Sequence, residues 1–132
     1  MTVTRPGGRP VHDSEQIAQM AADAIDDKKG FDVELLEVGD LLAITEIFVI
    51  ATGTSRTHVR AVADGVEEAL AEKAGRKPLR REGADQGEWV LLDYGDVVVH
   101  LFQPEQRDYY GLERLWRDAP KIVWEESVAT DA

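Results

Sequence analysis

Apolar side chains recur along the chain with two different periods, and the period predicts which segments form helices and which form strands. Residues 13–30 carry apolar positions every three or four residues, the spacing of a helix with one buried face. Asp13 can cap this helix, and Gln16 three residues later completes a capping box. Gly30 follows the last apolar position, so we expect it to supply the left-handed C-cap.

Two segments after this helix are typical of strands, and a long helix follows them. In residues 31–38 apolar and polar side chains alternate, as in a strand whose two faces are covered differently. Residues 47–52 (IFVIAT) are apolar on both faces, which predicts a central strand of the sheet. The next helix is expected to begin at Ser55, a good N-cap, and to end at Gly75.

The second half of the chain predicts a hairpin and a last helix. Two apolar runs, 89–93 and 96–102, flank a turn in which Gly95 can adopt the positive φ that tight hairpins need. Pro104 is expected to begin the last helix, and Pro120 to stop it. The apolar stripe of this helix consists of Tyr109, Leu112, Leu115 and Trp116.

The order of these elements is α, β, β, α, β, β, β, α, without an internal repeat, which predicts an α/β fold with one mixed β-sheet flanked by helices. A short edge strand is expected within 77–83 and another within 121–124. We expect a single domain over residues 13–125, between a disordered arm rich in Gly, Pro and Arg (1–12) and a disordered tail (126–132).

Composition narrows the class of protein. The chain has 132 residues and no cysteine, so a disulfide framework, a thiolate metal site and a Cys nucleophile are excluded. No apolar run approaches the roughly 20 residues that a membrane span needs, and the N-terminus lacks the apolar core of a secretory signal, so a cytoplasmic protein is expected. The net charge of −11 disfavours direct binding to nucleic acid and favours a basic partner.

The histidines give no indication of a metal site. His12, His58 and His100 are the only ones, and no two of them are spaced to ligate a metal from one helix. His100 lies within VVVHLF and shares a strand face with Val98 and Phe102. A general base needs a partner and a substrate within reach, and the sequence shows neither, so no metal and no cofactor is predicted.

The junction ATGTSRTH is the strongest hint of an enzyme. A helix beginning at Ser55 could hold a phosphate on its backbone N–H groups, although the Lys of a phosphate-binding loop is missing. A nucleotidyltransferase would also need paired carboxylates on a strand to hold metal ions. Asp93 and Asp96 flank the hairpin turn, where Asp more often forms the turn itself. A divergent nucleotidyl- or phosphotransferase remains an alternative.

The aromatic residues of the last helix are candidates either for a protein interface or for the core. By helical spacing, we expect Leu112, Leu115 and Trp116 to dock this helix on the sheet. Tyr110 and Glu113 lie to the side of that stripe and are better candidates for an exposed face.

Three segments in this order and spacing resemble the ribosomal silencing factor family, also called Iojap or RsfS. They are FVIATGTSRTHVRAVADGV, EWVLLDYGDVVVHLF and YYGLERLW, and the resemblance extends from about residue 13 to residue 118. The most specific part is the hairpin followed by Tyr-x-Leu-Glu-x-Leu-Trp, which ends at Trp116.

The resemblance implies a nucleotidyltransferase-like fold without the catalytic acidic pair, a homodimer and no enzymatic activity. It implies binding to the large ribosomal subunit through its fourteenth protein, which blocks association with the small subunit and represses translation. Family members also take part in large-subunit assembly, and a different basic partner would suit the same charge. We expect six residues to form the interface or its immediate support: Trp89, Asp93, His100, Tyr110, Glu113 and Trp116.

Overall fold

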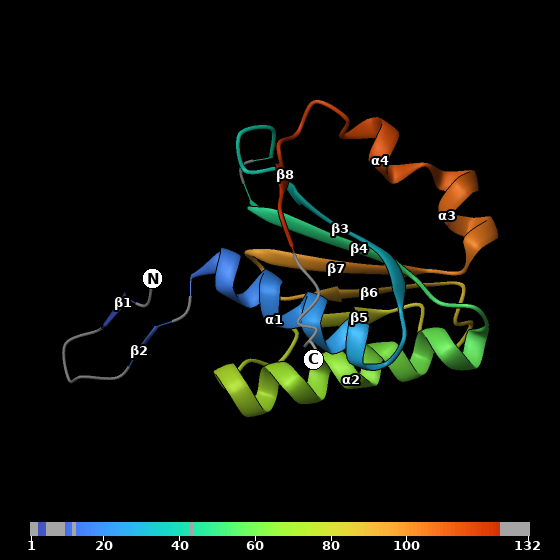
Figure 1. Ribbon diagram of the computed structural model, residues 1–132, viewed down its shortest axis with the longest axis horizontal. Helices are drawn as coiled ribbons and strands as arrows, with labels where there is room; N and C mark the ends of the chain where they lie inside the picture. Colours follow the sequence, from blue (N-terminus) through green and yellow to red (C-terminus); the bar gives the residue numbers. More distant parts are fainter. Residues whose placement is uncertain (1–2, 5–9, 12, 43, 125–132) are drawn as a thin grey trace, which may run out of the picture.

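The computed structural model describes residues 3–4, 10–11, 13–42 and 44–124. Near the N-terminus, Val3–Thr4 (β1) pairs antiparallel with Pro10–Val11 (β2), in a ribbon separate from the main sheet (Figure 1). The rest of the expected disordered arm (1–12), and the whole of the expected tail (126–132), lie outside the described residues.

The remaining elements form one mixed sheet with helices around it, as the sequence predicts. In chain order they are α1 (Ser14–Asp27), β3 (Phe31–Glu37), β4 (Ile47–Thr52), α2 (Arg56–Ala74), β5 (Arg80–Glu82), β6 (Trp89–Asp93), β7 (Val97–Phe102), α3 (Pro104–Tyr110), α4 (Leu112–Leu115) and β8 (Lys121–Ile122). The strand order is β5-β6-β7-β4-β3-β8. Only β4 and β7 pair in parallel within this sheet, and the other neighbours are antiparallel.

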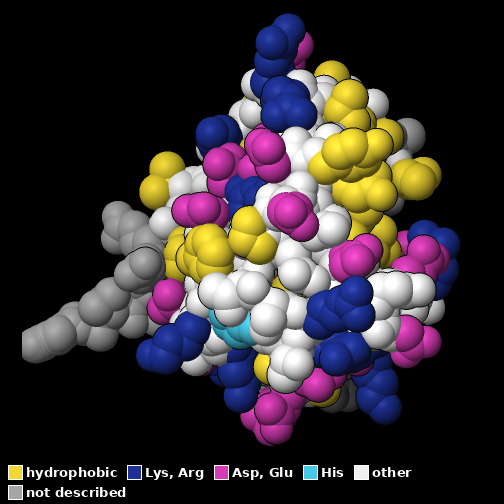
Figure 2. Space-filling model, turned by 90° about the vertical axis from the view of Figure 1, so that its right-hand side faces the viewer, with side chains coloured by type: hydrophobic (Ala, Val, Ile, Leu, Met, Phe, Trp, Pro, Cys, Tyr) yellow, Lys and Arg dark blue, Asp and Glu magenta, His cyan; other side chains and the backbone are white. Residues whose placement is uncertain are grey.

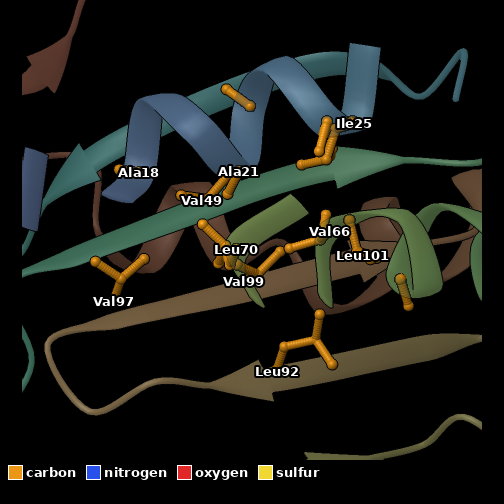
Figure 3. Packing of buried hydrophobic residues seen from close by; sticks show 14 of the residues in the cluster. Ala18, Ala21, Ile25, Val49, Val66, Leu70, Leu92, Val97, Val99 and Leu101 are labelled. Atoms are coloured by element: carbon orange, nitrogen blue, oxygen red, sulfur yellow. The ribbon is translucent and has the colours of Figure 1, made fainter. Parts of the chain in front are cut away.

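One face of the sheet, which we name the first face, is covered by the long helices α1 and α2 (Figure 1). Figure 3 shows Ala21 and Ile25 of α1 and Val66 and Leu70 of α2 meeting strand side chains such as Val99. Each of the larger side chains is fully buried, and such burial stabilises the fold by roughly 1.5–3 kcal/mol per residue. The small residues of α1 let that helix approach the sheet closely.

The opposite face, which we name the second face, is covered by shorter elements than the first. Its buried residues are Leu36, Val38, Phe48, Ile50, Val98, Phe102 and Ala119. Leu112 and Trp116, from the segment of α3 and α4, pack against this cluster and are only partly buried themselves. Trp89 and Leu91 of β6 are also left partly exposed, because no long helix lies over this end of the sheet.

The end of α1 differs from the prediction in one residue. The left-handed position is occupied by Lys29, with φ of 69°, and Gly30 does not have a positive φ. The N–H groups of both residues donate to carbonyls of the last turn, at Asp26 and Ile25. Position 30 requires glycine for a steric reason, because a Cβ there would collide with the Ile25 side chain. The predicted capping box of Asp13 and Gln16 is confirmed, as are the Ser55 and Gly75 caps of α2.

The last helix is not continuous, so the predicted stripe is partly wrong. Gly111 adopts a left-handed conformation, with φ of 56°, and separates α3 from α4. Because the prediction assumed one continuous helix across Gly111, it placed Leu115 on the sheet, whereas the side chain of Leu115 is 74% exposed. Leu112 and Trp116 do pack on the sheet, as expected. The helical turn ends at Leu115, well before Pro120.

Lys29→Gly tests the assignment of the α1 cap. Glycine adopts a positive φ without the steric cost that a side chain carries, so the free energy of unfolding should rise by about 1 kcal/mol. Gly75→Ala is the matched control of opposite sign: a Cβ there meets nothing, and only the φ of 65° opposes it. It should lower the free energy of unfolding by about 1 kcal/mol. Urea unfolding measures both, and a loss of stability in Lys29→Gly would contradict the assignment.

Candidate functional site

The partly exposed end of the second face carries a group of aromatic rings. Trp89 of β6 stands opposite Phe102 of β7 in the antiparallel register, and their rings stack with centroids 4.9 Å apart. The ring of Tyr110, at the end of α3, lies 4.7 Å from that of Trp89. Residues from two strands and a helix thus meet at one place. The sequence identified these aromatic residues but did not predict their contacts.

The group extends across the sheet to α4. The ring of Phe48, on β4, lies 4.7 Å from that of His100 and 5.6 Å from that of Trp116, edge-on in both cases. Edge-to-face pairs are favoured by the aromatic quadrupole in addition to the area that they bury. We refer to Phe48, Trp89, His100, Phe102, Tyr110 and Trp116 as the aromatic face.

His100 is the buried polar member of the aromatic face. It is 5% exposed, and the indole Nε1–H of Trp89 donates to its Nδ1 over 3.2 Å. Because an indole can only donate, His100 must carry its own proton on Nε2, which is buried and has no hydrogen-bond partner among the described residues. Burial lowers the pKa of His100 to about 4, although the charge of Asp93 acts to raise it. His100 therefore stays neutral at physiological pH.

The outer border of the aromatic face combines exposed rings with carboxylates. Tyr110 is 48% exposed and Tyr109 is 79% exposed, and their rings lie edge-on at 5.1 Å. Both line a hollow of about 550 Å³ with Glu88, Glu105, Gln106 and Asp108. Figure 2 views the side of the molecule where α3 lies and shows hydrophobic side chains gathered there beside acidic ones. Rings and carboxylates together suit a cationic side chain.

Asp93 lies at the opposite end of β6 from Trp89, and its carboxylate is engaged there by the hairpin turn and the edge strand. One carboxylate oxygen accepts from the N–H of Gly95 at 2.8 Å, the turn-forming role that the sequence suggested. The other oxygen pairs with Arg80 on the edge strand at 3.0 Å. Asp93 therefore supports the hairpin and influences His100 through its charge.

The carboxylate of Glu113 is engaged by an arginine and not by a residue of the aromatic face. It pairs with Arg107 at 2.7 Å, beside a hollow of about 400 Å³ that Phe31 and Thr52 also line. Of the six residues expected at the interface, four thus come together as part of the aromatic face, and Asp93 and Glu113 do not. Arg107 was not identified from the sequence, because two of its partners, Asp32 and Thr52, are distant along the chain.

The residues considered for an enzyme have structural partners. The Ser55 hydroxyl accepts from the N–H of His58 at 3.1 Å and so caps α2. Asp96 binds Arg76 at 2.7 Å and Ser14 at 2.9 Å. Burial raises the pKa of Asp96, but these hydrogen bonds outweigh it and the net pKa is lowered. Within the described residues, no three His, Cys, Asp or Glu side chains are placed to hold a metal ion, and no helix could cross a membrane.

Comparison with known proteins gives one consistent family. The profile described as "Ribosomal silencing factor during starvation" matches residues 11–132. A ribosomal silencing factor of Halalkalibacterium halodurans is 40% identical over 112 residues, 85% of this chain and 95% of the relative. The mouse mitochondrial assembly of ribosomal large subunit protein 1 is 33% identical over 64% of this chain and 38% of its own length. A crystal structure of a Chromobacterium violaceum protein, 39% identical, superposes with a TM-score of 0.78 over 86% of this chain and 92% of that one.

The buried neutral His100 predicts a pH dependence of stability. The ordinary His pKa of 6.5 is lowered to about 4 on folding, so the unfolded chain takes up this proton first as the pH falls. The stabilisation is complete above about pH 6.5 and is lost toward about pH 4. Between about pH 7 and about pH 4.5 the unmodified protein should lose about 2 kcal/mol more than His100→Gln. Urea unfolding at both pH values measures this difference, and equal losses would contradict the burial of a neutral imidazole.

Proposed function

The chain belongs to the ribosomal silencing factor family, and we propose that it binds the large ribosomal subunit and blocks joining with the small subunit. In this proposal it docks through the fourteenth protein of the large subunit and represses translation in the cytoplasm. The protein acts by occupying space, so binding is sufficient and no catalytic residue, metal or cofactor is assigned. Its resting form is a homodimer.

The observation that carries the proposal is the outer border of the aromatic face. Tyr109 and Tyr110 present exposed rings beside Glu88, Glu105 and Asp108, and the whole chain has a net charge of −11. Ribosomal proteins are rich in Lys and Arg, and their side chains can pair with carboxylates and lie over aromatic rings. The surface therefore fits a basic protein partner better than it fits bare RNA, whose phosphates the carboxylates would repel.

A rigid support behind these rings makes the surface suitable for binding. Trp89 stacks on Phe102 and receives Tyr110 on its outer side, while its indole is fixed by His100. Side chains that are ordered before binding lose less conformational entropy on docking, which favours affinity. In this proposal Tyr110, Trp89 and Trp116 contribute directly to the interface, whereas His100, Asp93 and Glu113 support it.

Assembly of the large subunit is a second candidate function. The name of the mouse relative describes assembly of the mitochondrial large ribosomal subunit, and that protein shares 33% identity with this chain. A factor that shields the joining surface could serve both roles through one docking surface. The enzymatic alternative has less support, since Ser55 and Asp96 are already engaged in capping and ion pairing.

Purified subunits test the occlusion directly. When large and small subunits are mixed under joining conditions, adding this protein should reduce the joined peak in a sucrose gradient. The protein should then sediment with the free large subunit. If it remains at the top of the gradient and joining is unchanged, the proposed function is wrong.

Tyr110→Ala tests the proposed surface. Removing this half-exposed ring should weaken binding to the large subunit by about tenfold or more, with only a small change in melting temperature. Leu79→Ala is a suitable control, since Leu79 is exposed to a similar or greater degree and lies next to the edge strand β5. A large fall in melting temperature for Tyr110→Ala would show instead that this ring belongs to the core.

A further inference from the structure

The segment of α3 and α4 bends at Gly111, and the two ends of this elbow carry rings of the aromatic face. Tyr110 directly precedes the bend and meets Trp89, while Trp116 follows α4 and meets Phe48. Neither short helix has a buried residue of its own. The two helices are therefore too short, and too exposed, to fix the elbow by apolar burial within themselves.

One side chain ties the elbow to the sheet. Arg107 of α3 donates from Nη1 to the backbone carbonyl of Asp32 at 2.6 Å and to the hydroxyl of Thr52 at 2.7 Å. Its Nε donates to the Glu113 carboxylate across the bend at 2.8 Å, and Nη2 lies 2.7 Å from the same oxygen. A single guanidinium thus joins α3 to β3, β4 and α4.

The surroundings of Arg107 make these contacts strong. Its side chain is 11% exposed and that of Glu113 is 30% exposed, so water screens this pair less than an exposed one. Thr52 is buried at the end of β4, and Asp32 has a φ of 52° at the irregularity of the β3–β4 pairing. Only a planar fork with several donors can reach such differently placed acceptors at once.

The hollow beside this cluster is not itself a good ligand site. It lies past the end of β4, where α/β proteins often bind ligands, and Arg107 and Arg114 both line it. However, Arg107 has donors engaged with three protein partners, and Asp32, Asp108 and Glu113 line the same hollow. An anionic ligand would have to displace these partners. The contacts of Arg107 point to a role in holding the elbow.

We propose that Arg107 is a positioning residue for partner binding: it fixes the angle of the elbow so that Tyr110 rests on Trp89 and Trp116 rests on Phe48. This inference rests on the proposed function, since the arrangement of rings is the one that binds the large subunit. The guanidinium of Arg107 is engaged by Asp32, Thr52 and Glu113, so in this inference it acts on the partner only through the rings that it positions.

The test compares Arg107→Met with Arg117→Met. Both remove one positive charge from the same segment, but Arg117 is exposed. Affinity for purified large subunits is measured for each variant and for the unmodified protein. Arg107→Met should bind at least tenfold more weakly, whereas Arg117→Met should bind as the unmodified protein does. Arg107→Lys keeps the charge without the fork, and it should recover only part of the affinity.

The chain has three tryptophans: two report the position of the elbow independently of binding, and the third serves as an internal control. In a ¹H–¹⁵N spectrum, the indole signals of Trp89 and Trp116 should shift in Arg107→Met. The signal of Trp124 should stay unchanged, because its indole donates to Asp23 of α1 at 2.9 Å and packs against the first face. Should Arg107→Met not fold, Thr52→Val removes one acceptor with little change of shape. It should shift the same two signals and weaken binding severalfold.

The outcomes separate this inference from the proposed function. If the unmodified protein does not bind large subunits, both are wrong. If it binds and Arg107→Met binds equally well, only the role of Arg107 is wrong. Weaker binding with all three indole signals unchanged also overturns the inference, because Arg107 would then act through its charge alone.

Discussion

The parallel pairing of β4 with β7 is the constraint on which the rest of the fold depends. Both strands are buried along their whole length, so each face of the sheet must be covered by other elements. The chain leaves β4 toward the first face through α2 and leaves β7 toward the second face through α3. The first face receives two long helices. Among the described residues, the second face receives the short helices α3 and α4 and loop residues such as Leu42 and Ala119, so its aromatic end stays partly open.

Most of the fold could be predicted from the sequence, because its helix ends, strands and turns depend on residues close together along the chain. The caps at Asp13, Ser55 and Gly75, the apolar β4 and the hairpin around Gly95 depend on neighbours within a few residues, and the structure confirms them. The C-cap of α1 was predicted wrongly, because residue type alone favoured glycine for the left-handed position. Gly30 serves close packing, whereas Lys29 takes the left-handed position.

The candidate site could be predicted only in part, because it depends on contacts between distant segments. Residue type identified the rings, but helical counting across Gly111 assigned Leu115 to the core and did not find the exposed Tyr109. Arg107 looks like an ordinary surface residue of α3 in the sequence. Its partners Thr52 and Asp32 are 55 and 75 residues away, so only the tertiary fold shows that its charge is nearly buried.

The incomplete covering of the second face by helices links the fold to its proposed action. A long helix over β6 would bury Trp89 and stabilise the domain further, but it would remove the surface that a partner can reach. The structure instead keeps Trp89 ordered by contacts with Phe102 and His100 of the neighbouring strand β7 and with Tyr110 of α3. A protein that acts by occupying space needs a surface of this kind, rigid and partly apolar with a charged border. The proposed action calls for no reactive group, and the carboxylates of Asp93 and Asp96 pair with Arg80 and Arg76.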